Sequence, residues 1–266
     1  MASLHKTTIQ SGSGVRTAAF SLRPIDRASP RPVVLFLHGS LRNSAVLQAW
    51  ADPIDPVADA VFFDLPGHGQ SDAIADMSVR GIATHVAATL RAALGPRRVV
   101  LVGESLGGTV AFAVAGMPAA DSVAAVLAAD PPLTTAKLWS VAQAHLRRLH
   151  QLPADHYLHG YADKVFGLTR RGLEERIYYP LLGDLRIPTV IAAGDTPLFP
   201  PRNMDGSTTI FDAVDEFVTR NLYPGRIEIE RIANCGHLVL VEAAQASLAI
   251  IMRLLAAHAP PAPAAT

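Results

Sequence analysis

Residues 98–115 read RVVLVGESLGGTVAFAVA. The first third is a run of β-branched and other apolar residues, which is typical of a buried strand. The last third is apolar on almost every side, which is typical of a buried helix. Between them lies a G-x-S-x-G pentapeptide centred on Ser105, and strand, turn and helix form the context in which such a serine acts as a nucleophile. Because the pentapeptide alone is a common chance match, this context carries the prediction.

The composition indicates one large domain without a charge bias. Half of the 266 residues are hydrophobic, and 23 Lys and Arg balance 23 Asp and Glu, so no net charge attracts nucleic acid or an anionic membrane. Cys235 is the single cysteine, which excludes a disulfide framework, and it lies outside any metal-ligand spacing. The first residues do not form a signal peptide and no apolar run has membrane-spanning length, so we expect a soluble cytoplasmic protein.

Alternating apolar strands and amphipathic helices predict an α/β fold with a mainly parallel, doubly wound sheet of eight strands. The expected strands cover 4–10, 14–23, 33–37, 60–63, 98–102, 123–129, 189–193 and 226–232. The expected helices begin near residues 43, 79, 106, 209 and 238, with Ser78 as N-cap of the second and Gly95 at its end. No convincing strand is expected in 133–183. We predict a core of residues 1–132 and 184–258, a helical cap over 133–183 and a disordered Pro/Ala-rich tail over 259–266.

Five chemically active residues directly follow predicted strands. They are His38, Ser105, Asp130, Asp195 and His237. Sites in doubly wound sheets gather at the carboxyl ends of the strands. This shared location favours function independently of any one motif.

The chain resembles the α/β-hydrolase superfamily of the serine-nucleophile type over nearly its whole length. The resemblance rests on four motifs in register: His38-Gly39, Asp64-x-Pro66-Gly67-His68-Gly69-x-Ser71, Gly103-x-Ser105-x-Gly107 and Gly236-His237. It implies Ser105 as nucleophile and His237 as general base, in the family's chain order. It also implies an oxyanion hole formed by the backbone amides of Ser40 and Leu106, with His38 shaping the loop. Members that open epoxides or displace halide use an aspartate, so Ser105 disfavours those reactions.

The acid that orients the base has two main candidates. Many members of the family place it in a Gly-x-x-Asp loop after the penultimate strand, where this chain has Gly194-Asp195-Thr196-Pro197 with proline in the usual acid position. A variant of the family carries it after the strand that follows the elbow helix, where this chain has Asp130. We favour Asp130, keep Asp195 as the alternative, and leave Asp205 or no acid as lesser possibilities.

The predicted activity is that of a cofactor-free serine hydrolase, without metal, that cleaves a carboxylic ester or lactone of a small, largely apolar substrate through an acyl-enzyme. Carbon–carbon bond hydrolase, thioesterase and acyltransferase reactions use the same residues, and a non-catalytic small-molecule receptor is the alternative of another class. We expect a small acyl substrate, no nucleic acid and no membrane as partners, with monomer or homodimer left open. Candidate substrate contacts are His38, Leu133, Trp139, Tyr178 and Tyr179, and Leu138 and Phe166 are further candidates for an apolar wall.

Overall fold

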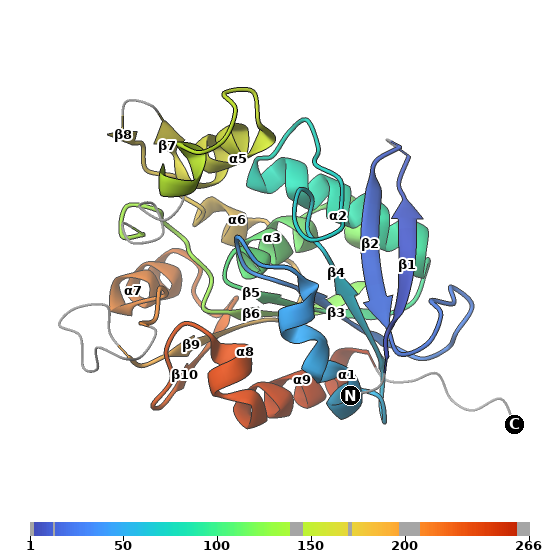
Figure 1. Cartoon of the computed structure of the whole chain (residues 1–266). Coiled ribbons are helices and arrows are strands. Elements are labelled where there is room, and N and C mark those ends of the chain that lie inside the picture. Colours follow the sequence, from blue (N-terminus) through green and yellow to red (C-terminus); the bar gives the residue numbers. More distant parts are fainter. Residues whose placement is uncertain (1–2, 13, 139–145, 170–171, 197–207, 260–266) are drawn as a thin grey trace, which may run out of the picture.

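The computed structural model describes residues 3–12, 14–138, 146–169, 172–196 and 208–259. Within these residues an eight-stranded sheet forms in the order β1-β2-β4-β3-β5-β6-β9-β10 (Figure 1). Strand β2 pairs antiparallel with β1 and β4, and every other pairing in this sheet is parallel. The predicted, mainly parallel sheet is therefore confirmed. The strands are β1 (His5–Gln10), β2 (Arg16–Ser21), β3 (Val33–Leu37), β4 (Asp59–Phe63), β5 (Val99–Glu104), β6 (Val123–Ala129), β9 (Thr189–Gly194) and β10 (Glu228–Ile232).

Helices cover both faces of the sheet, and the alternation of strand side chains divides the core into two parts. In β3, Val33, Leu35 and Leu37 pack with α2 (Val79–Leu94) and α3 (Leu106–Ala115). Val34 and Phe36 pack on the opposite face with η1 (Ser44–Trp50), α1 (Ala51–Ile54) and α9 (Ala244–His258). Burial on both faces explains why the central strands are continuous apolar runs.

The helix boundaries follow local capping. The hydroxyl of Ser78 accepts the Gly81 amide at 3.0 Å, so α2 begins where the sequence predicts. The helix expected from residue 209 instead begins later, as α7 (Ala213–Leu222). Asp212 and Asp215 form a reciprocal capping box at this point, which leaves 209–212 as a turn.

The segment 133–183 contains α5 (Tyr157–Phe166), β7 (Leu168–Thr169), β8 (Gly172–Leu173) and α6 (Pro180–Gly183). The expectation of no strand there is wrong, because β7 and β8 pair antiparallel. Gly167, in the left-handed region with φ 69°, ends α5 and turns the chain into β7. Strands of two residues are too short to produce an alternating pattern in the sequence. Helix α5 lies over the loops after β3 and β4, where Tyr157 donates to the Gly67 carbonyl at 2.5 Å.

Near the carboxyl end, α8 (Val239–Glu242) leads into α9. The predicted tail begins one residue too early, since Ala259 is buried and its amide donates to the Leu255 carbonyl at 2.9 Å. The rest of that predicted tail, 260–266, lies outside the described residues. Within the described parts of the chain, no helix is both long enough and apolar enough to cross a bilayer.

Candidate active site

Ser105 lies at the junction of β5 and α3 with φ 55° and ψ −121°, a conformation that residues with a Cβ rarely adopt. Its flanking glycines are sterically required. A Cβ on Gly107 would lie 2.2 Å from the Leu37 carbonyl oxygen, and one on Gly103 would lie 2.2 Å from the Gly107 carbonyl oxygen. The predicted sharp turn is thus present, and only glycine allows strand and helix to approach this closely.

The loop after β3 lies against the same serine. A Cβ on Gly39 would be 3.2 Å from the Ser105 Cβ and 3.7 Å from its Oγ. The next residue, Ser40, places its hydroxyl 2.5 Å from the phenol oxygen of Tyr161, which is fully buried in α5. Helix α5 therefore holds the side chain of Ser40 through Tyr161, and Ser40 lines the same cavity as Ser105.

His38 supports this loop from inside the fold and does not face the site. Its side chain is fully buried, its Nε2 accepts the Leu65 amide at 3.0 Å, and its Nδ1 donates to the Gly39 carbonyl at 2.7 Å. Burial lowers the pKa of His38 to about 4, with the nearby His68 as the second cause. The ring is therefore a neutral structural bridge, and the expectation that His38 contacts substrate is corrected.

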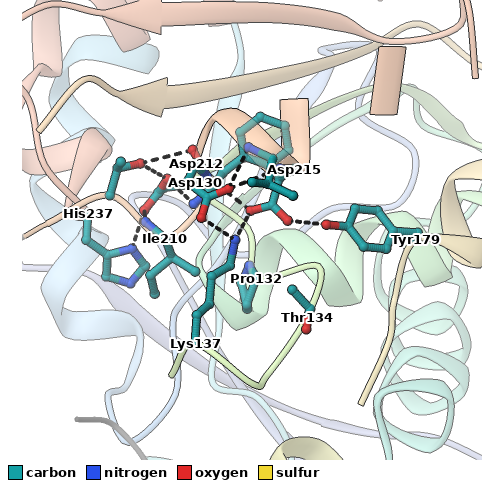
Figure 2. Close-up of polar contacts among 12 residues, drawn as sticks. Asp130, Pro132, Thr134, Lys137, Tyr179, Ile210, Asp212, Asp215 and His237 are labelled. Carbon is teal, nitrogen blue, oxygen red and sulfur yellow. Dashed lines mark hydrogen bonds and ion pairs between the residues drawn. The ribbon is translucent and has the colours of Figure 1, made fainter. Parts of the chain in front are cut away.

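Asp130 and His237 form a direct hydrogen bond, drawn in Figure 2, in which the imidazole Nδ1 donates to Asp130 Oδ2 at 2.6 Å. Asp130 directly follows β6, has a positive φ of 46° and is fully buried. Its carboxylate also accepts the amides of Ile210 at 2.7 Å and Phe211 at 3.0 Å, and the Thr209 hydroxyl. These donors compensate the burial of a carboxylate, which otherwise carries a large desolvation penalty.

The loop that carries His237 is held by a second carboxylate. Glu242 in α8 accepts the Gly236 amide at 2.7 Å and the Leu238 amide at 3.2 Å, one on each side of the histidine. Gly194 lets this loop cross the end of β9, because a Cβ there would lie 2.1 Å from the Cys235 carbonyl oxygen. The pKa of the Cys235 thiol is raised to about 11, mainly by burial. The nearby carboxylates of Glu242, Asp130 and Asp195 add to that rise. The histidine loop thus lies in negative surroundings.

The second acid candidate, Asp195, follows Gly194 and is partly exposed. The next residue, Thr196, donates its amide to the Cys235 carbonyl at 3.0 Å, which joins this turn to the histidine loop. Asp205 lies outside the described residues. Among the described residues, the bond of Asp130 to the imidazole Nδ1 of His237 is in place at 2.6 Å.

A cavity of about 200 Å³ opens beside the serine and is bounded by both Ser105 and His237. Its lining residues are Gly39, Ser40, Arg42, Glu104, Ser105, Leu106, Pro132, Leu138, Phe166, Ile210, His237 and Leu238. Ser40 and Leu106, expected at the oxyanion hole, are among them, as are Leu138 and Phe166 from 133–183. Arg42 and Glu104 add an ion pair with a 2.5 Å separation.

The other described residues expected to contact substrate are not among those that line this cavity. Leu133 is fully buried in the core, Tyr178 donates to the Val165 carbonyl at 2.6 Å, and the Tyr179 hydroxyl bonds to Asp215. None of these three is among the residues that line the cavity, so their contact with substrate stays a prediction, and Trp139 lies outside the described residues. Sequence patterns did not indicate Pro132, Ile210 or Leu238, although Pro132 follows Asp130 by two positions. Within the described residues, no cluster of three or more His, Cys, Asp or Glu could hold a metal ion.

A family model described as alpha/beta hydrolase fold matches residues 32–164. The chain belongs to the α/β-hydrolase fold family. Over 82 residues it is 39% identical to 2-succinyl-6-hydroxy-2,4-cyclohexadiene-1-carboxylate synthase of Serratia proteamaculans (strain 568), a match that spans 31% of each chain. The match therefore covers about a third of the length of this curated relative.

Solved structures with low sequence identity share the fold over nearly the whole chain. E-2-(acetamidomethylene)succinate hydrolase has a TM-score of 0.71 at 19% identity, covering 96% of this chain and 100% of that one. Carboxylesterase CesB from Bacillus subtilis has a TM-score of 0.66 at 16% identity, with 95% and 92% covered. A thioesterase domain from the curacin biosynthetic pathway has a TM-score of 0.63 at 19% identity, with 94% and 99% covered.

In this α/β-hydrolase, the Asp64 motif braces the loop after β4. The Asp64 carboxylate accepts the amides of Ser44 and Gln70, each at 2.8 Å, and a Cβ on Gly69 would lie 2.1 Å from Asp64 Oδ2. His68 is buried, and its Nδ1 donates to the Pro66 carbonyl at 2.9 Å. These contacts hold the loop after β4 in place beside the loops around Ser105.

Proposed function

We propose that this α/β-hydrolase is a cofactor-free serine hydrolase that cleaves a carboxylic ester or lactone of a small, largely apolar substrate through an acyl-enzyme. One observation carries the proposal. The imidazole of His237, bonded to the buried carboxylate of Asp130, lines the same cavity as Ser105 on its strained turn. A serine needs a base because its hydroxyl is barely ionised at neutral pH, and a base held by a carboxylate is what acyl transfer requires.

In the proposed mechanism, Asp130 accepts the Nδ1 proton of His237 and thereby selects the tautomer whose Nε2 takes up a proton. Nε2 removes the proton of Ser105 Oγ as that oxygen attacks the substrate carbonyl carbon. The C–O bond to the leaving alcohol then breaks, and His237 returns the proton to that alcohol. Water then attacks the acyl carbon as His237 removes one of its protons. The bond between that carbon and Ser105 Oγ breaks, His237 returns the proton to Oγ, and the acid product leaves.

The oxyanion formed at each step needs donors already in place. We assign this role to the backbone amides of Ser40 and Leu106, whose residues line the cavity beside Ser105. Leu106 is the first residue of α3, so the helix N-terminus adds its positive end to the site. Each such donor contributes about 10²–10³ in rate in enzymes of this kind.

We further propose that 133–183 serves as a cap. Leu138 and Phe166 from this segment line the cavity, together with Pro132, Ile210 and Leu238. Tyr157 and Tyr161 join the segment to the loops after β4 and β3. This apolar wall supports a small apolar acyl or leaving group as the natural occupant.

The same residues support carbon–carbon bond cleavage, thioester hydrolysis and acyl transfer. The partial similarity to a protein named as a synthase, and the shared fold with a thioesterase domain, make these reactions part of the test. A receptor on a hydrolase scaffold is the alternative of another class, and it predicts binding without turnover.

Two experiments test the proposal. A fluorophosphonate probe is expected to label wild-type protein and to leave a folded Ser105→Ala variant unlabelled; absence of labelling in folded wild-type protein would favour the receptor. Initial rates with p-nitrophenyl esters of increasing chain length, lactones and thioesters then identify the bond. A preference for thioesters or an inability to cleave any ester or lactone would overturn the ester assignment while leaving the nucleophile in place.

A further inference from the structure

The carboxylate of Asp130 is held by a short turn as well as by His237. This turn, Thr209–Asp212, contributes the Thr209 hydroxyl and the backbone amides of Ile210 and Phe211 to the carboxylate. Phe211 is fully buried. The position of Asp130 therefore depends on where this turn lies.

The turn is fixed in its place by the first residues of α7. The Asp212 amide donates to Asp215 Oδ2 at 3.0 Å, and Asp212 Oδ1 accepts the amides of Val214 at 2.9 Å and Asp215 at 3.1 Å. On the other side, Arg231 of β10 donates to the carbonyls of Phe211 at 2.7 Å and Asp212 at 2.8 Å. Asp215 is fully buried, so its carboxylate needs compensating donors.

Two of those donors come from the distant segment 133–183. Figure 2 shows Lys137 and Tyr179 converging on Asp215, where the ammonium and the phenol each donate to one carboxylate oxygen. The Lys137 ammonium also lies 3.1 Å from Asp212 Oδ2. Burial raises the pKa of Tyr179, and the hydrogen bond to Asp215 raises it further. The phenol therefore remains protonated, and a donor, at neutral pH. Hydrogen bonds therefore connect Tyr179 and Lys137 to Asp215 and Asp215 to Asp212, the backbone of the turn continues from Asp212 to Phe211, and hydrogen bonds connect the turn to Asp130 and His237.

We infer that Lys137 and Tyr179 are positioning residues for the acid Asp130, and that they make the orientation of His237 depend on the docking of 133–183. This inference rests on the proposed function for its kinetic consequence. Without the phenol, Asp215 Oδ1 loses the donor that Tyr179 supplies. Without the ammonium, Oδ2 keeps the Asp212 amide, and the buried negative charge loses its cation. In either case the carboxylate must move or recruit water. The turn that it holds then loosens, and the Asp130 carboxylate loses its fixed aim at His237. Small displacements of this kind reduce rates strongly because proton transfer demands close geometry.

Tyr179→Phe and Lys137→Met test the inference, with Lys137→Arg as the conservative variant. Lys164→Met is the matched control, because Lys164 lies in the same segment and pairs with Asp76 at 3.0 Å on the surface. With one ester substrate, we expect kcat to fall about 10- to 100-fold in Tyr179→Phe and Lys137→Met, with KM changing less than about twofold. Lys137→Arg and Lys164→Met are expected to stay within about threefold of wild type.

A spectroscopic readout separates positioning from loss of stability. The Nδ1 proton of His237, bonded to Asp130, is expected as a far-downfield proton NMR signal that is absent from His237→Gln. It should weaken or shift in Tyr179→Phe and Lys137→Met and persist in both control variants. Unchanged kcat and an unchanged signal, or a lowered Tm with both unchanged, would overturn the inference. If wild-type protein fails to react with the fluorophosphonate, the proposed function fails, and the NMR comparison still decides whether Tyr179 and Lys137 orient the pair.

Discussion

The Nδ1 atom of His237 lies 2.6 Å from Oδ2 of Asp130, a residue 107 positions earlier in the chain. Asp130 follows β6, and β6 is the neighbour of β5, which ends at the elbow of Ser105. The proposed acid therefore lies after the strand next to the one that carries the proposed nucleophile. The loop after β9, where many relatives place their acid, instead joins the histidine loop through Thr196 and Cys235.

Asp130→Asn is expected to reduce kcat by about 10³–10⁴-fold, because an amide does not hold the imidazole in the tautomer that accepts the serine proton. Asp195→Asn should retain at least about a tenth of the wild-type rate, since it leaves the bond between Asp130 and His237 intact. Steady-state kinetics on the two variants, side by side, check this. The reverse order of effects would transfer the role of acid to Asp195.

Two glycines near Ser105 should respond differently to an added methyl group. In Gly107→Ala the new carbon would overlap the Leu37 carbonyl oxygen at 2.2 Å, so the free energy of unfolding should fall by about 3 kcal/mol or more. In Gly39→Ala the nearest atom is the Ser105 Cβ at 3.2 Å, a contact that a small shift relieves. Denaturant unfolding should therefore show a small loss for Gly39→Ala, whereas its kcat falls clearly. Comparable destabilisation of both variants would contradict this steric account.

We expect the burial of His38 to make the free energy of unfolding depend on pH. Its pKa of about 4 in the folded protein lies below the ordinary value of 6.5, so the unfolded chain binds a proton that the folded protein rejects. The stability that neutral His38 contributes to the free energy of unfolding is fully present above about pH 6.5 and is lost as the pH falls toward 4. Its size is about 3 kcal/mol, at 1.36 kcal/mol per pH unit. Urea unfolding at several pH values should show a flatter dependence in His38→Gln than in wild type. Parallel curves for the two proteins would show that His38 does not titrate in this way.

The ion pair at the cavity should also show a pH signature. Burial raises the pKa of Glu104, and Arg42 opposes that rise from 2.5 Å away. In Arg42→Met the pKa of Glu104 should rise further, so the folded state keeps a proton that the unfolded chain has released. The free energy of unfolding of the variant should then decrease with rising pH, by about 2–3 kcal/mol near pH 8 relative to wild type.

The double variant Arg42→Met with Glu104→Gln is the control for that prediction. It has no carboxyl to titrate at this position, so the extra pH dependence should disappear. A loss of stability in Arg42→Met that is the same at pH 5 and pH 8 would mean that packing of the arginine side chain, and not the charge of Glu104, is responsible.

Much of the fold was predictable because each central strand is buried on both faces and therefore apolar throughout. The elbow at Ser105, the eight-stranded sheet and the start of α2 at Ser78 follow from such local patterns. The two-residue strands β7 and β8 were missed because they are too short for a pattern. Helix α7 begins at Ala213 and not at residue 209 because Asp212 and Asp215 cap it reciprocally, and the spacing of apolar residues carries no signal for that pairing.

The site was only partly predictable, for a physical reason. Residues that directly follow strands converge on one edge, which is why Asp130 and His237 could be named. The cavity wall is built by tertiary packing, and Ile210 and Leu238 carry no local signal for it. Tyr178 and Tyr179 were expected to contact substrate because aromatic residues suit apolar pockets, yet their hydroxyls bond to protein groups elsewhere.

Among the described non-glycine residues, Leu41, Ser105, Asp130 and Asn234 have positive φ, and all four lie in loops that follow strands at the edge where the site forms. Ser105→Gly should therefore yield a protein more stable than wild type by about 1 kcal/mol, because glycine adopts this conformation without strain. Such a variant would keep the cavity and lack the oxygen that we propose as the attacking atom. It would be the preferred form in which to capture an uncleaved substrate for crystallography. The difference between its melting temperature and that of wild type would measure the stability that the strained backbone at Ser105 costs the protein.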